Sequence, residues 1–104
     1  MSQVNKAIQE TNRLFRAVLE DEAEQRELFT FVTDHSQELN QPRIIVKLLT
    51  IIDISSSFIT QHLEFCLTFF HLIQNTSFRN EQLPLAAEKR MALFCDLMND
   101  LKLN

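Results

Sequence analysis

The sequence predicts an all-α protein, an antiparallel bundle of three to four helices with a long, highly apolar central helix. The chain contains no glycine, and the tight turns of β-hairpins favour glycine. From residue 43 to residue 75, polar residues recur three or four positions apart, which is the period of a helix and not of a strand. A length of 104 residues with 45% hydrophobic side chains predicts a single helical domain, 1–104.

Two helices, 3–20 and 22–39, are expected in the first part of the chain. Their apolar residues follow helical spacing on both sides of an acidic stretch: Val4, Ala7, Ile8, Leu14, Phe15, Val18 and Leu19, then Leu28, Phe29, Val32 and Leu39. Asp21 followed three positions later by Glu24 resembles a capping box, which favours a break near 20–23. One continuous helix over 3–39 is the alternative.

The central helix is expected over 42–75. Asn40 suits the end of the preceding helix, and Pro42 suits the first turn of the next. One polar stripe then runs through the whole segment: Arg43, Lys47, Thr50, Asp53, Ser57, Gln61, Glu64, Thr68, His71 and Asn75. A single helix of this length spans about 50 Å. A break at Ser55, Ser56 and Ser57 is the alternative, because serine hydroxyls compete for backbone hydrogen bonds.

The last helix is expected over 82–102, after a loop that contains "NTSFRNEQLP". Pro84 suits its first turn. Its apolar face is formed by residues that repeat every three or four positions, with four leucines widening it: Ala87, Met91, Phe94, Met98 and Leu101, then Leu83, Leu85, Leu93 and Leu97.

A helix that is apolar around most of its circumference needs cover on most sides. Two neighbouring helices do not provide this for 42–75, so the sequence predicts a protein partner or a second copy of the chain, most simply a homodimer. The partner would pack helix against groove on Phe58, Phe65, Phe69 and Leu72, with burial of the phenylalanines in the core of the chain itself as the alternative. The acidic residues Glu20, Asp21 and Glu24 are a candidate docking patch for a basic partner, with a solvated helix start as the alternative.

No catalytic residue, cofactor or metal site is predicted. Phosphate-binding loops, dinucleotide fingerprints and nucleophile elbows all require glycine, which the chain lacks. His62 and Cys66 share a helix face, but a zinc site needs a third protein ligand, and His35 and His71 are out of phase with that pair. A metal-binding helical protein is therefore retained only as an alternative.

The charge balance disfavours nucleic-acid binding. The formal net charge is −4, and the basic residues of the first and last helices, which include Arg13, Arg16, Lys89 and Arg90, are spread out and do not form one basic field. A small transcription regulator or other nucleic-acid-linked protein is a second alternative.

The sequence thus predicts a non-enzymatic interaction module of the adaptor, chaperone, immunity or inhibitor type. Its N-terminus lacks the apolar stretch of a signal peptide, and Cys66 and Cys95 both lie in apolar periodic segments as expected of free thiols. A cytoplasmic protein is expected. Charged residues interrupt every 20-residue window of the central segment, so no membrane span is expected there.

Overall fold

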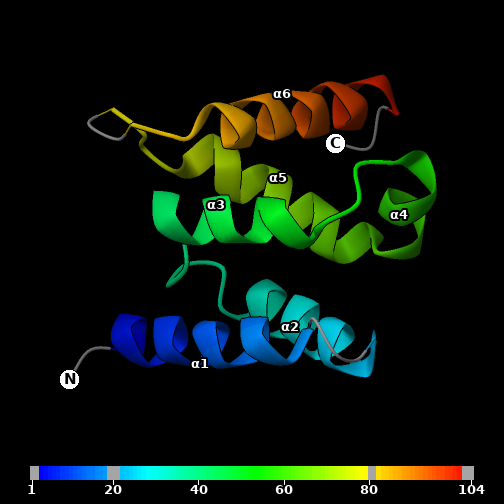
Figure 1. Cartoon of the computed structure of the whole chain (residues 1–104). Helices are drawn as coiled ribbons and strands as arrows, with labels where there is room; N and C mark the ends of the chain where they lie inside the picture. Colours follow the sequence, from blue (N-terminus) through cyan, green and yellow to red (C-terminus); the bar gives the residue numbers. More distant parts are fainter. Residues whose placement is uncertain (1–2, 19–21, 80–81, 102–104) are drawn as a thin grey trace. The chain divides into compact units, whose positions relative to one another are not determined.

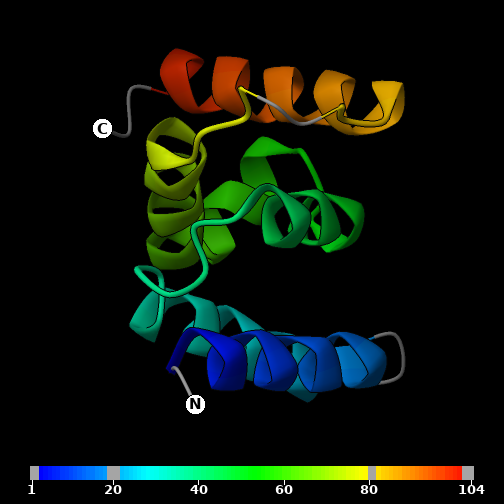
Figure 2. The same cartoon turned by 90° about the vertical axis from the view of Figure 1, so that its left-hand side faces the viewer.

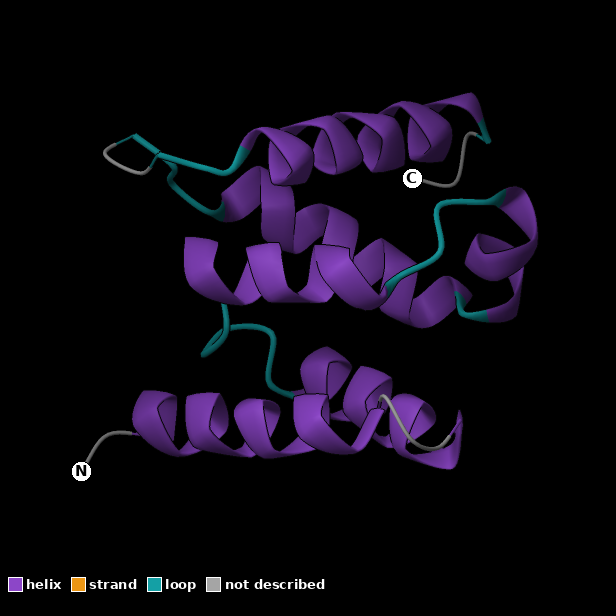
Figure 3. Cartoon of the chain, in the orientation of Figure 1, coloured by secondary structure: helices purple, strands orange, loops and turns teal. Residues whose placement is uncertain are grey.

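The computed structural model describes residues 3–18, 22–79 and 82–101. Over these residues the chain forms helices joined by loops and no strand (Figure 3). The helices are α1 (Gln3–Val18), α2 (Glu22–Asp34), α3 (Pro42–Ile51), α4 (Ser56–Gln61), α5 (Leu63–Asn75) and α6 (Leu85–Asp100) (Figure 1). The all-α class is confirmed, but the described residues form six helices and not the predicted three to four.

The helices fall into two compact units, residues 1–39 and 40–104, which are described separately. Whether they make one domain stays a prediction. In the first unit, α1 and α2 lie side by side and run in opposite directions (Figure 1). Ala7 and Thr11 of α1 and Leu28, Phe29 and Val32 of α2 are buried. The Thr11 hydroxyl donates to the carbonyl of Ala7 at 2.8 Å, so this buried polar group is satisfied.

The break expected near 20–23 is confirmed, because α1 and α2 lie side by side and run in opposite directions (Figure 1). The expected cap residue Asp21 lies outside the described residues. The second helix ends at Asp34 and not at residue 39. Residues 35–38 form turns in which the N–H of Glu38 donates to the His35 carbonyl at 3.0 Å. Such bonds between residues three apart tighten and end a helix.

The prediction of a single helix over 42–75 is wrong, and the alternative break at the serines is what the structure shows. The backbone is extended at Ile52 and again at Ser55. The Ser55 hydroxyl accepts a hydrogen bond from the N–H of Phe58 at 3.1 Å, which caps α4. A second break follows at His62, between α4 and α5. Pro42 begins α3, as expected.

These breaks let the chain turn back on itself, so that α5 packs against α3. Figure 2 shows α5 running across α6 and not alongside it. Aromatic rings meet where these helices pack: the Phe69 ring lies 5.7 Å from Phe65 and 5.3 Å from Phe94 of α6. The apolar residues of the broken segment are buried, among them Ile45, Leu48, Leu49, Ile59, Cys66 and Phe70.

Arg90 of α6 joins that helix to the end of α3. Its Nε donates to the carbonyl of Leu49 at 2.6 Å, and its Nη2 donates to the carbonyl of Ile52. The last carbonyls of a helix have no partner within the helix, and a cation there also complements the helix dipole. The guanidinium therefore caps α3 from outside.

Candidate protein-binding site

The four apolar residues predicted to meet a partner are buried in the structure. Phe58 is 9% exposed, Phe65 3%, Phe69 0% and Leu72 4%. The expectation that they form an exposed face is wrong, because it assumed one straight helix with too few neighbours. The segment is broken, α5 packs against α3, and the Phe69 ring lies against Phe94 of α6. A partner role for these residues stays a prediction.

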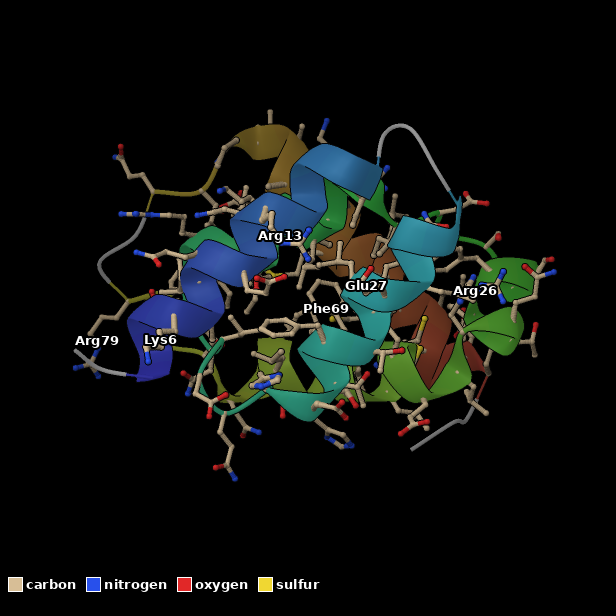
Figure 4. All side chains as sticks on the ribbon, turned by 90° about the horizontal axis from the view of Figure 1, so that it is seen from below. Lys6, Arg13, Arg26, Glu27, Phe69 and Arg79 are labelled. Carbon is tan, nitrogen blue, oxygen red and sulfur yellow. The ribbon has the colours of Figure 1, made fainter. Side chains whose placement is uncertain are left out.

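The predicted acidic patch falls mostly on residues that the structure does not describe. Glu20 and Asp21 lie outside the described residues, and so does the side chain of Glu24, a residue of α2. Nearby, the Nη2 of Arg13 in α1 lies 3.6 Å from a carboxylate oxygen of Glu27 in α2 (Figure 4). The same guanidinium donates to Glu10, and this hydrogen bond lowers the pKa of the Glu10 carboxyl. Arg13 thus pairs with acids of its own unit.

Two leucines of α6 are the most exposed large apolar side chains among the described residues. Leu85 is 66% exposed and Leu93 is 58% exposed. Leu93 shares one side of the helix with the exposed Ala86 and the half-buried Leu97, since these residues are seven and four positions apart. We call Ala86, Leu93 and Leu97, with Leu85 at their edge, the α6 outer face.

The α6 outer face lies beside the face that holds the helix in its own unit. The buried residues of α6 each follow a residue of the outer face by one position; they are Ala87, Phe94 and Met98. Apolar residues therefore occupy two neighbouring sides of α6. The sequence pattern predicts Leu93 and Leu97 as a widening of the buried face, which the exposure of Leu93 contradicts. The signal that separates the two faces is the repeat of residues 86, 93 and 97, offset by one position from 87, 94 and 98.

Charged residues border the outer face in an ordered way. Lys89, Asp96 and Asp100 are all exposed, and their spacing of seven and four places them on the same edge of the face. The opposite edge carries Arg90, which is bound to the carbonyls at the end of α3. On the edge formed by Lys89, Asp96 and Asp100, the positive charge lies toward the N-terminal half of the helix and the negative charges lie toward its C-terminal half.

Two hollows open within the units. The first, of about 430 Å³, lies in the first unit and is lined by Lys6, Ala7, Glu10, Phe31, His35 and Glu38. The second, of about 420 Å³, lies in the second unit and is lined by Gln41, Pro42, Arg43, Val46, Lys47, Gln82, Leu83 and Pro84. In the first hollow, the rings of Phe31 and His35 stack with 4.1 Å between centroids. One carboxylate oxygen of Glu38 is buried without a hydrogen-bond partner.

The residues weighed for a metal site do not converge. Within the described part of the chain, no group of three or more His, Cys, Asp or Glu side chains is placed to hold an ion. Cys66 and Cys95 are both free thiols. Burial raises the pKa of Cys66 to about 12. Burial, with a smaller contribution from the charge of Asp96, also raises the pKa of Cys95.

The two thiols are expected to differ in reactivity. At pH 8 a thiol with a pKa near 12 is roughly a thousandfold less ionised than an ordinary cysteine, and the thiolate is the reactive form. We expect Cys66 to resist Ellman's reagent until the protein is unfolded, while the half-buried Cys95 reacts slowly in the folded state. The measurement is the number of thiols that react at pH 8, and their rates, with and without guanidinium. A slow phase that remains in Cys66→Ala belongs to Cys95. Two equally fast thiols in the folded protein would contradict this placement of Cys66.

Among the described helices, none is both long and apolar enough to span a membrane. Comparison with protein-family models, with curated proteins and with solved structures found no match for the chain.

Proposed function

We propose that the protein is a non-enzymatic protein–protein interaction module that docks through the α6 outer face. The observation that carries this proposal is the high exposure of Leu85 and Leu93 on one helix. Covering an exposed leucine side chain yields about 1.5–3 kcal/mol, so two or three of them favour association with another apolar surface.

The way α6 is held also supports a docking role. Its buried side inserts Phe94 and Met98 into the second unit, and Arg90 fixes it to the end of α3. A helix held in this way loses little conformational freedom when a partner binds, which lowers the entropic cost of association. The expected mode is packing of a partner helix against α6. The partner would contact Ala86, Leu93 and Leu97, which are seven and four positions apart. The partner's identity decides whether the module acts as an adaptor, a chaperone, an immunity protein or an inhibitor.

The proposal is tested by placing a photo-crosslinking amino acid, benzoylphenylalanine, at position 93 in cells that produce the protein. The matched control is the same substitution at Glu88, which is exposed on the opposite side of α6. We expect ultraviolet light to produce a discrete covalent adduct from position 93 and none from position 88. Equal adducts from both positions, or none from position 93, would overturn the proposal.

A further inference from the structure

We infer that the occupant of the α6 outer face is α6 of a second copy of this chain, packed antiparallel about a two-fold axis beside Leu93. This inference rests on the proposed function and names its partner. It follows from the order of charges along the edge of the outer face, which fits its own reversed copy.

In an antiparallel pair whose two-fold axis passes beside Leu93, each residue before position 93 lies level, along the helix axis, with a residue of the second copy. That residue is the one equally far after position 93. Lys89 then lies level with Leu97 of the second copy, between Asp96 and Asp100 of that copy. The symmetry also brings the same edge of both helices together, and all three charged residues lie on that edge. Each Lys89 therefore meets two carboxylates, and the pairing forms twice. Leu93 packs against its own copy at the centre.

The parallel arrangement lacks this match. A two-fold axis parallel to the helices brings opposite edges together, so each Lys89 would face the edge that carries Arg90 of the second copy, and Asp96 and Asp100 would meet no positive charge there. Like charges at the rim of an interface disfavour association and reject that orientation. The edge charges of α6 thus favour the antiparallel arrangement over the parallel one.

The exposed part of one helix is a small interface. Stable complexes bury about 1,200–2,000 Å² in total, and a contact made by one helix from each copy lies at or below the lower end of that range. The dimer is expected to dissociate in the micromolar range, so its assembly depends on protein concentration.

Charge reversal on the full-length chain tests the inference, with dissociation constants measured by analytical ultracentrifugation from about 1 μM to 1 mM. We expect Lys89→Asp and Asp96→Lys each to weaken the dimer about tenfold or more, because the first replaces four attractions by repulsions and the second replaces two. An equimolar mixture of the two variants is expected to form a heterodimer. The double variant Lys89→Asp/Asp96→Lys is expected to dimerise more tightly than Lys89→Asp but less tightly than the wild type, because positions 89 and 96 attract again while Asp100 repels the new carboxylate. Glu88→Lys changes the charge equally on the opposite side of the helix and is expected to leave the dimer unchanged.

Single reversals that leave the dimer unchanged, or a mixture that does not associate, would overturn the antiparallel pairing. A wild-type chain that is monomeric at 1 mM would overturn self-association altogether. The mass of the crosslinked adduct from position 93 shows whether self-association alone fails or the proposed docking role fails as well. An adduct of about twice 12.2 kDa supports the second copy. A discrete adduct of another mass overturns this inference and leaves the docking role standing, and the absence of an adduct overturns both.

Discussion

Replacing Phe69 with aspartate is expected to unfold residues 40–104. Phe69 is fully buried, with Phe65 5.7 Å and Phe94 5.3 Å away between ring centroids. Removing a buried phenylalanine side chain costs about 3–5 kcal/mol. Burying an unpaired carboxylate in its place adds several kcal/mol more. Because the total stability of a domain is typically about 5–15 kcal/mol, the helical circular-dichroism signal of this region and its cooperative melting should be lost.

Leu93→Asp is the matched control for Phe69→Asp. It introduces the same carboxylate on the same class of side chain, but at a position that is 58% exposed. We expect its helical signal and melting temperature, measured at low micromolar concentration, to stay close to those of the wild type. A Phe69→Asp variant that keeps the wild-type melting temperature would show that Phe69 is not core, and would support the partner role predicted from the sequence.

Arg90→Met is expected to lower the free energy of unfolding by about 2–4 kcal/mol. The substitution keeps much of the aliphatic side chain but removes the donors to the carbonyls of Leu49 and Ile52. Hydrogen bonds from a charged donor contribute about 1.5–3 kcal/mol each, and the half-buried Arg90 belongs at the low end of that range, so its two bonds contribute about 3 kcal/mol. The favourable charge at the C-terminal end of a helix adds less than about 1 kcal/mol. Urea unfolding followed by circular dichroism measures the loss.

Two further variants separate the cap from a general effect of charge. Arg90→Lys keeps the charge but not the two-pronged geometry of the guanidinium. We therefore expect it to lower the free energy of unfolding, but by less than Arg90→Met does. Arg43→Met removes an exposed arginine from α3 and is expected to change stability by less than about 0.5 kcal/mol. Equal losses for Arg43→Met and Arg90→Met would contradict the capping role.

The sequence was sufficient to predict the helical class and several helix boundaries, because these depend on local patterns. The absence of glycine and the polar spacing predicted helices, and Pro42 was correctly placed in the first turn of α3. Pro84 is the N-cap residue before α6 and not part of its first turn, and α6 begins at Leu85 and not at residue 82 as predicted. Periodicity did not reveal the break at Ser55. A stripe that stays in phase is compatible with a capped break, and whether a serine hydroxyl caps a new helix depends on tertiary packing.

The candidate site was harder to predict, because exposure depends on which faces find neighbours. A partner for the aromatic residues around Phe69 was predicted because one straight helix was predicted over 42–75. Once α5 turns back, it packs against α3 and the Phe69 ring meets Phe94 of α6. The most exposed large apolar side chains among the described residues are then Leu85 and Leu93 of α6. Leu93 was counted with Phe94 as one apolar face, although adjacent residues point about 100° apart around a helix.

The most direct test of docking through α6 compares the molar masses of the wild-type chain and Leu93→Asp by light scattering over a concentration series. We predict that the wild-type mass rises with concentration from 12.2 kDa toward twice that value, while the variant stays at 12.2 kDa. Identical masses for the two proteins at every concentration, whether monomeric or dimeric, would contradict pairing through the α6 outer face.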